Sequence, residues 1–117
     1  MSKTLWALIF KMAMTFVAGL LTLTLIDGNA WWAVLVIAAV ATALNYVVGD
    51  QLVLPAWGNV TAAIGDGLMA AIVAWIIALA WPAVAVSWIS LLVFAVIVAV
   101  GEYFFHNYLL SSEEVAP

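Results

Sequence analysis

Long runs of apolar residues, separated by short polar or turn-forming segments, dominate the pattern along the chain. A helix needs about 20 apolar residues to cross the hydrocarbon core of a bilayer, which is about 30 Å thick. Four runs meet this requirement. The pattern predicts one domain over residues 1–117, with transmembrane helices at residues 4–26, 31–48, 60–81 and 87–109 and an acidic C-terminal tail at residues 110–117.

Turn signals set the ends of the first two predicted helices. Asp27-Gly28-Asn29 follows the first apolar run, and Gly49-Asp50 follows the second. The next segment, residues 51–59, begins and ends with a polar residue and contains the turn formers Pro55 and Gly58. We therefore expect a loop between the second and third helices.

The last apolar region must contain two helices. No charge occurs between Asp66 and Glu102, and one helix over this segment would be about 52 Å long at about 1.5 Å per residue. Trp81-Pro82 supplies the break, because a residue before proline avoids helical geometry. Four helices with short connections predict an all-α membrane protein, an antiparallel four-helix bundle.

The composition excludes several classes of protein. Hydrophobic residues make up 70% of the chain and charged residues only 7%, whereas about a quarter of the residues in soluble domains are charged. Lys3 and Lys11 are the only basic residues, so we expect no nucleic-acid partner. The absence of cysteine excludes disulfides, thiolate metal sites and thiol catalysis.

The same two lysines bear on orientation. Both lie near the N-terminus, which favours a cytoplasmic N-terminus. Four spans then bring the C-terminus and the loop over residues 50–59 to the same side. Lys11 interrupts the first apolar run and no small-residue cleavage site follows, so we expect this helix to be retained and not cleaved as a signal peptide.

Each predicted helix carries one polar residue about two turns from its cytoplasmic end: Lys11, Asn45, Asp66 and Glu102. At about 1.5 Å per residue, all four lie about 9 Å below the membrane boundary. Charges inside a bilayer are costly and usually pair within the bundle. Lys11 can neutralise only one of the two carboxyl groups. The other must be protonated, reach water or hold a cation.

Two further residues belong near this layer. His106 follows Glu102 by four residues and therefore shares its helical face, one turn nearer the cytoplasm. Asp50 is expected at the cytoplasmic mouth of the space that these polar side chains line. The predicted site thus comprises Lys11, Asn45, Asp50, Asp66, Glu102 and His106.

Two functions remain open for this layer. Polar contacts and small residues hold helices together in lipid, and Gly67 lies in a small-residue stripe on the third helix. We favour a structural or accessory bundle whose polar layer keeps the helices in register. The alternative is a small proton- or cation-handling transporter or channel that uses Asp66, Glu102 and His106. These three residues are also the candidate metal ligands, although a spacing of four is a weak signal.

No motif points to catalysis or to a cofactor. The chain has no Gly-rich phosphate loop and no serine with a partnered base. Ser87 and Ser90 are expected near the opposite membrane face from His106, and Asp27 is expected only to end a turn. We therefore expect a protein that is not an enzyme and carries no cofactor. Its partners would be the lipid bilayer and either a second copy of the chain or a larger membrane complex.

Several short motifs resemble the YndM-like family, small four-helix membrane proteins of Gram-positive, often spore-forming bacteria that are catalogued as a domain of unknown function. The motifs are Phe10-Lys11, Gly49-Asp50, Leu54-Pro55, Gly58-Asn59, Ala63 with Asp66, and Gly101-Glu102-Tyr103-Phe104-Phe105-His106. The resemblance implies a multi-pass protein of the bacterial plasma membrane, and it implies no activity. Ala56 and Asn107 stand where basic residues are expected in such proteins, which weakens the positive charge on the cytoplasmic side.

The small multidrug exporters are another architecture of about four spans in a short chain. Their coupling site is a carboxylate in the first helix. This chain has Lys11 there, which argues against the same mechanism.

Overall fold

Four long helical segments make up the computed structural model, which describes residues 3–111 and the side chains of residues 4–107. Two of the segments change locally to π-helix. In chain order the elements are α1 (Lys3–Gly19), η1 (Leu20–Thr24), α2 (Trp31–Leu44), η2 (Asn45–Val53), α3 (Leu54–Trp57), α4 (Asn59–Ala80) and α5 (Trp88–Ser111). The predicted tail from residue 112 onward lies outside the described residues, as does the side chain of Lys3.

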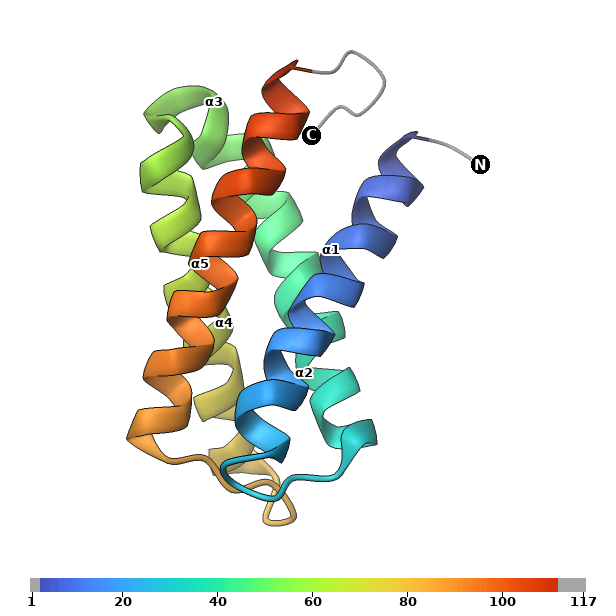
Figure 1. Ribbon diagram of the computed structural model, residues 1–117, viewed down its shortest axis with the longest axis vertical. Helices are drawn as coiled ribbons and strands as arrows, with labels where there is room; N and C mark the ends of the chain where they lie inside the picture. The colour runs from blue at the N-terminus through green and yellow to red at the C-terminus, as the bar shows by residue number, and fades with distance from the viewer. Residues whose placement is uncertain (1–2, 112–117) are drawn as a thin grey trace.

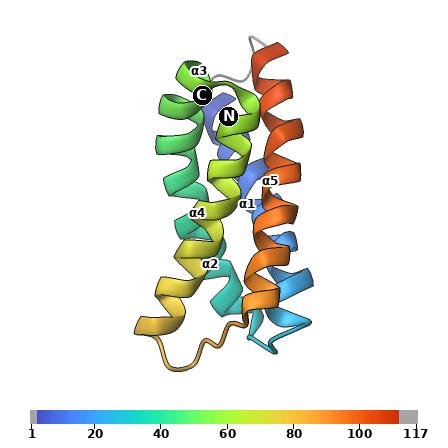
Figure 2. The same ribbon diagram turned by 90° about the vertical axis from the view of Figure 1, so that its left-hand side faces the viewer.

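Each segment is long and apolar enough to cross a membrane. The candidate spans are Thr4–Thr24, Trp31–Trp57, Asn59–Ala80 and Trp88–Asn107. Neighbouring segments run in opposite directions along the long axis (Figures 1 and 2). The prediction of an all-α antiparallel bundle of four transmembrane helices is therefore confirmed.

The bundle has two distinct ends. At one end, here called the terminal end, α1 begins, α5 ends and α3 lies (Figure 1). The opposite end carries the connections over residues 25–30 and 81–87 and is called the loop end. Helix contacts join α1 to α2, α2 to α4, α4 to α5, and α5 back to α1. The four spans thus form a closed ring around one interior.

The second span is longer than the sequence pattern predicts. Gly49-Asp50 does not end it. The helix continues through η2 into α3 and ends at Trp57, so the expected loop over residues 51–59 is wrong. Pro55 is the second residue of α3, just after the helix changes from the π-helical turns of η2 to α-helical turns. The turn is confined to Gly58, whose φ of +88° suits glycine.

The predicted break at Trp81-Pro82 is present, because α4 ends at Ala80 and Trp81 is extended, with φ −127° and ψ 103°. Polar side chains join the two connections at the loop end. Asn29 donates to Ala85 O at 2.6 Å and accepts from Ala85 N at 2.9 Å. Asp27 accepts hydrogen bonds from Ser87 N and Ser90 Oγ, so it does more than end a turn.

The environment of Asp27 also changes its acidity. Burial disfavours the charged carboxylate, but the hydrogen bonds from Ser90 and Ser87 favour it more strongly. Together they hold the pKa of Asp27 below its usual value.

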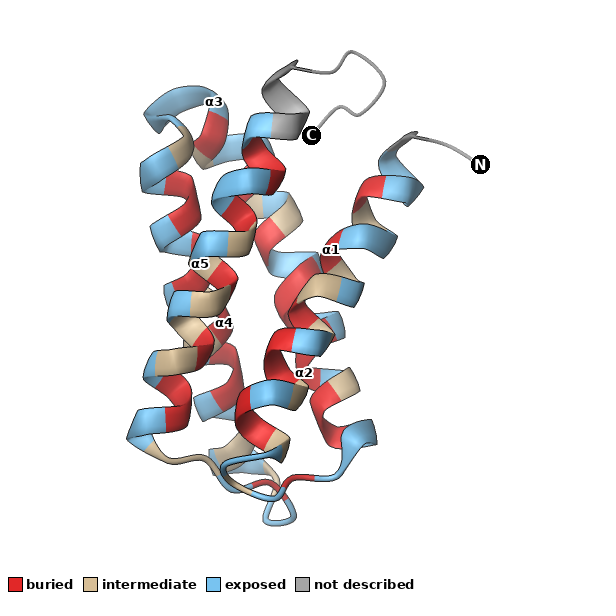
Figure 3. Ribbon diagram, viewed as in Figure 1, coloured by how far each residue is buried: buried red, intermediate tan, exposed pale blue. Residues whose placement is uncertain are grey.

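The burial pattern separates a packed interior from an apolar exterior. Buried and exposed residues alternate along each of the long helices (Figure 3), as expected where one face of a helix is packed against its neighbours. Leu23, Ile37 and Phe94 are fully buried within the main apolar cluster. A Cβ at Gly67 would overlap Ala95 O, so this glycine lets α4 and α5 approach closely. The exposed face carries many large apolar side chains, as expected for a surface in contact with lipid.

Candidate functional site

All six site residues that the sequence predicts lie inside the bundle, near its terminal end. Their exposed fractions are 1% for Asp66 and 0% for the other five. We call this set the polar layer: Lys11 on α1, Asn45 and Asp50 on η2, Asp66 on α4, and Glu102 and His106 on α5. The layer therefore draws at least one side chain from every span.

Lys11 links the first span to two others. Its Nζ lies 2.5 Å from Asp50 Oδ2 and 3.1 Å from Glu102 Oε2. The ammonium also lies 5.6 Å from the centre of the Phe105 ring, within the range of a cation–π contact. Lys11 thus reaches Glu102, one of the two partners that the sequence predicts.

The expected position of Asp50, at the mouth of the space that the polar side chains line, is wrong. Asp50 is fully buried and makes the shorter of the two ion pairs with Lys11. The cause is local, because the helix continues through η2 and turns Asn45, Gly49 and Asp50 toward the interior. π-Helical turns of this kind are frequent at functional sites.

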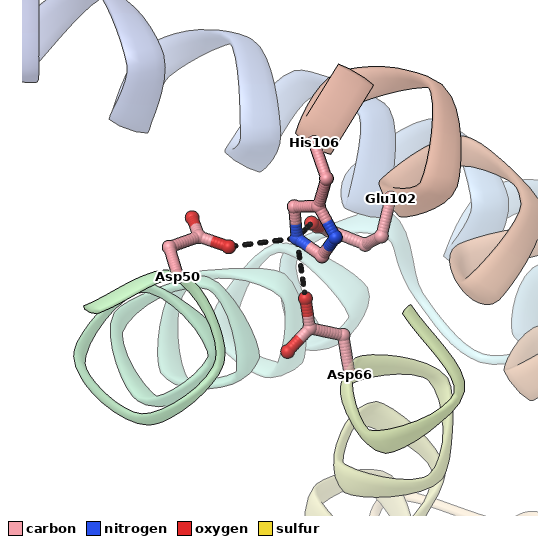
Figure 4. A group of neighbouring side chains, drawn as sticks. All are labelled: Asp50, Asp66, Glu102 and His106. Carbon is pink, nitrogen blue, oxygen red and sulfur yellow. Dashed lines mark hydrogen bonds and ion pairs between the residues drawn. The ribbon is translucent and has the colours of Figure 1, made fainter. Parts of the chain in front are cut away.

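His106 lies at the point where three carboxyl groups meet. Its Nε2 is 2.8 Å from Asp50 Oδ1, 3.1 Å from Asp66 Oδ2 and 3.1 Å from Glu102 Oε2. Figure 4 shows the three carboxyl groups directed at one imidazole nitrogen. One donor atom from each of the four residues lies within 4.8 Å of all the others. We call these four residues the acid–histidine centre.

Asn59, which the sequence analysis did not select, fixes the orientation of His106. The Asn59 amide nitrogen donates to Tyr103 O and Asn107 Oδ1, both at 3.0 Å. Its Oδ1 therefore faces His106 Nδ1, also at 3.0 Å. An amide oxygen can only accept, so Nδ1 carries a hydrogen. A usable signal was present, since Asn59 precedes Asp66 by two helical turns and shares its face.

Two residues of the second span bring η2 close to α4. Asn45 donates to the backbone oxygen of Asp66 at 3.3 Å. A Cβ at Gly49 would overlap the Asp66 carboxyl group. Gly49 is therefore the residue that allows Asp66 to enter the acid–histidine centre.

The layer contains more acid than base. Three buried carboxyl groups face one lysine, which leaves two negative charges in excess when the imidazole is neutral. Neither oxygen of Asp66 and neither oxygen of Glu102 accepts a hydrogen bond from the described residues. Buried charges are retained where they are paired or bind an ion. Asp50, Asp66, Glu102 and His106 are the residues that could hold a metal ion.

Ser87 and Ser90 lie at the loop end with Asp27, whereas His106 lies at the terminal end. This arrangement agrees with the expected separation of these serines from the histidine.

Comparisons with known proteins place the chain in a family. The model of a protein family of unknown function, DUF2512, matches residues 2–115. The chain is 32% identical over 111 residues to the uncharacterized membrane protein YndM of Bacillus subtilis (strain 168), which covers 94% of this chain and 62% of that relative. The chain thus spans less than two thirds of the relative's length. No solved structure matches it. The four candidate spans and the family match agree, and this chain belongs to the DUF2512 family of membrane proteins.

Proposed function

We propose that this protein holds a metal cation inside the membrane, at the polar layer that joins its four spans. The observation that carries the proposal is the imbalance of buried charge. Asp50, Asp66 and Glu102 are enclosed with a single lysine. Uncompensated charge in a membrane interior is costly, and a bound cation removes the excess without breaking any contact of Lys11.

The proposal includes a location. We place the protein in the bacterial plasma membrane as a multi-pass protein with both termini on the cytoplasmic side. Lys3 and Lys11 in the N-terminal part of the chain support this orientation, and the bacterial relative supports the type of membrane. The polar layer would then lie in the cytoplasmic half of the bilayer. We propose no enzymatic reaction.

The experiment measures the unfolding midpoint of the full chain in detergent while single salts are added at constant pH and ionic strength. The panel contains monovalent and divalent cations. A ligand that binds only the folded state at a hundred times its Kd stabilises that state by about 2.7 kcal/mol. We expect the midpoint to rise with at least one cation, and we expect Asp66→Asn to lose most of that rise.

The control is Asp27→Asn, which removes a carboxylate at the loop end, away from the layer. It should keep the full response to the cation. A midpoint that no salt changes, or an equal rise in Asp66→Asn, would overturn the proposal.

A second candidate is the structural function, in which the layer only keeps the helices in register. The two ion pairs of Lys11 and the bond from Asn45 to Asp66 O favour it, because they join all four spans. The two candidates differ in the behaviour of Asp66→Asn. In a purely structural layer this change relieves repulsion between carboxylates, so the midpoint rises and does not depend on added cations.

A further inference from the structure

We infer that Asp50, Asp66, Glu102 and His106 bind one divalent ion of a first-row transition metal, such as Mn²⁺, Fe²⁺, Co²⁺ or Zn²⁺. This inference rests on the proposed function and names the class of cation. Its basis is the arrangement of donor atoms, the hydrogen-bonding state of His106 and the two buried carboxyl groups whose oxygens accept no hydrogen bond from the described residues.

The distances from His106 Nε2 to the three carboxyl groups fit direct coordination of one ion. Two ligand atoms that bind one ion at about 2.0–2.2 Å, at angles between octahedral and tetrahedral values, lie about 2.8–3.6 Å apart. The Nε2 atom of His106 lies 2.8–3.1 Å from one oxygen of each carboxyl group. A single N–H on Nε2 could satisfy one of these oxygens well, but not all three. An ion placed among the four atoms satisfies them together.

The hydrogen bond from His106 to Asn59 determines what Nε2 offers. Nδ1 donates to Asn59 Oδ1 at 3.0 Å, so in the neutral ring Nε2 carries a lone pair. Three carboxyl groups surround this nitrogen (Figure 4), and the contact is repulsive unless a proton or a metal ion lies among them. A proton on Nε2 serves one oxygen well, whereas a metal ion serves all three. Metal-binding histidines characteristically donate their other N–H to an oxygen acceptor in this way.

The carboxyl groups point independently to a bound ion. Asp66 is 1% exposed and Glu102 is fully buried. None of their four side-chain oxygens accepts a hydrogen bond from the part of the chain that the structure describes. Buried polar atoms in native proteins nearly always have a partner. Both groups point into the acid–histidine centre (Figure 4), which is where an ion would provide that partner.

The donor types and the charge select the class of ion. One imidazole nitrogen with three carboxylate oxygens is a mixed set that suits borderline divalent ions, whereas Ca²⁺ and Mg²⁺ prefer oxygen alone. Lys11 neutralises one of the three carboxylates through its contacts with Asp50 and Glu102. The remaining charge equals that of one divalent ion, so the occupied layer is electrically neutral.

The test uses Co²⁺ as the probe, because its visible absorption reports the number and type of ligands. The full chain is purified in detergent with an affinity tag that contains no histidine, treated with chelator and titrated with Co²⁺. We expect one ion per chain and an absorption spectrum typical of direct nitrogen and oxygen ligation. Zn²⁺ should displace the Co²⁺ and abolish the spectrum.

Single substitutions distinguish the residues that bind the ion directly from the residues that only surround the site. Asp66→Asn and His106→Gln should lose the Co²⁺ spectrum. Asn59→Ala should bind Co²⁺ about 10–100-fold more weakly, because Asn59 positions the histidine ligand. Asp27→Asn is the matched control and should bind as the wild type does. Circular dichroism verifies that each variant is still helical.

A measurement on the wild-type chain tests the histidine ligand even if the variants fail to fold. His106 is the only histidine in the sequence, so labelling with ¹⁵N-histidine marks a single side chain. Pulsed electron paramagnetic resonance of bound Mn²⁺ should show coupling to that label.

The possible results distinguish a failure of the transition-metal site from a failure of the proposed cation binding as a whole. Stabilisation by Na⁺, K⁺, Mg²⁺ or Ca²⁺ that Asp66→Asn abolishes, with no Co²⁺ spectrum and no coupling to ¹⁵N, would refute the transition-metal site and leave the proposed function standing. No dependence on any cation would refute both. Co²⁺ binding that persists in both Asp66→Asn and His106→Gln would place the ion elsewhere and overturn the inference.

Discussion

Lys11 shows how a single residue can hold several helices together in an apolar environment. It is the one lysine side chain that the structure describes, and its Nζ contacts a carboxyl group on η2 and another on α5. Removing one partner of a buried ion pair costs more than the pair contributes, because the remaining charge stays buried without compensation. The position is therefore sensitive to substitution even though the net value of the ion pairs is small.

We expect Lys11→Met to lower the stability of the metal-free bundle by about 3 kcal/mol, in the range observed for broken buried pairs. The double change Lys11→Met with Asp50→Asn should recover part of this loss, because it removes the closest of the unpaired charges. Unfolding in detergent, followed by circular dichroism in the presence of a chelator, measures both effects. Ile9→Met on the exposed face of α1 is the control and should unfold as the wild type does. An unchanged midpoint for Lys11→Met would show that the ion pairs contribute nothing.

Much of the site can be predicted from the sequence at this scale. Counting residues from the helix ends selected Lys11, Asp66 and Glu102, because the rise per residue converts sequence position directly into depth. The spacing of four between Glu102 and His106 placed both on one face. Asn59 was missed because the expected loop left it outside any helix, although its spacing of two turns from Asp66 would have placed both residues on one face. Its role depends on hydrogen bonds to Tyr103 O and Asn107 Oδ1, which only the packing of α4 against α5 creates.

The second span is the element where sequence reasoning fails most clearly. Gly49-Asp50 with Pro55 and Gly58 close behind marks a turn in water, where a freed backbone group can bind solvent. Inside a bilayer each backbone N–H and C=O must be satisfied within the segment, so a helix is maintained. The chain therefore continues from α2 through η2 to Trp57. This continuation, and not a loop, carries Asp50 into the interior.

Gly49 provides a direct test of that arrangement. A Cβ there would overlap the Asp66 carboxyl group, and overpacking of this kind typically costs about 1–3 kcal/mol. We expect Gly49→Ala to lower the unfolding midpoint and to weaken cation binding, because α4 must move away from η2. The measurement is thermal unfolding in detergent together with a cation titration.

Gly65→Ala is the matched control, since no atom lies within 4 Å of the Cβ it would add on α4. This change should stabilise the helix by about 0.5–1 kcal/mol, because alanine loses less backbone entropy than glycine. If the two alanine variants behaved alike, the close approach of η2 to Asp66 would not matter for stability.

At the scale of the whole molecule, different interactions hold the bundle together at its two ends. At the loop end, Asn29 and Asp27 join two connections through hydrogen bonds. Toward the terminal end, the polar layer joins all four spans through the contacts of Lys11 and His106 with carboxyl groups. Between the two ends, the interior of the bundle is filled by buried apolar side chains such as Phe94. This asymmetry places the acid–histidine centre near one end of the bundle, so the orientation of the chain decides which membrane face the centre lies closer to.

The orientation of the chain in the membrane can be tested with introduced cysteines. The chain has no cysteine, so a single introduced thiol reports one position without background. Ala30 and Ala56 are both exposed and lie at opposite ends of the second span. In intact bacterial cells, a reagent that does not cross the membrane should label Ala30→Cys, and it should label Ala56→Cys only after the cells are opened. The reverse pattern would place the acid–histidine centre near the outer face. Labelling of both positions in intact cells would contradict the crossing of the second span itself.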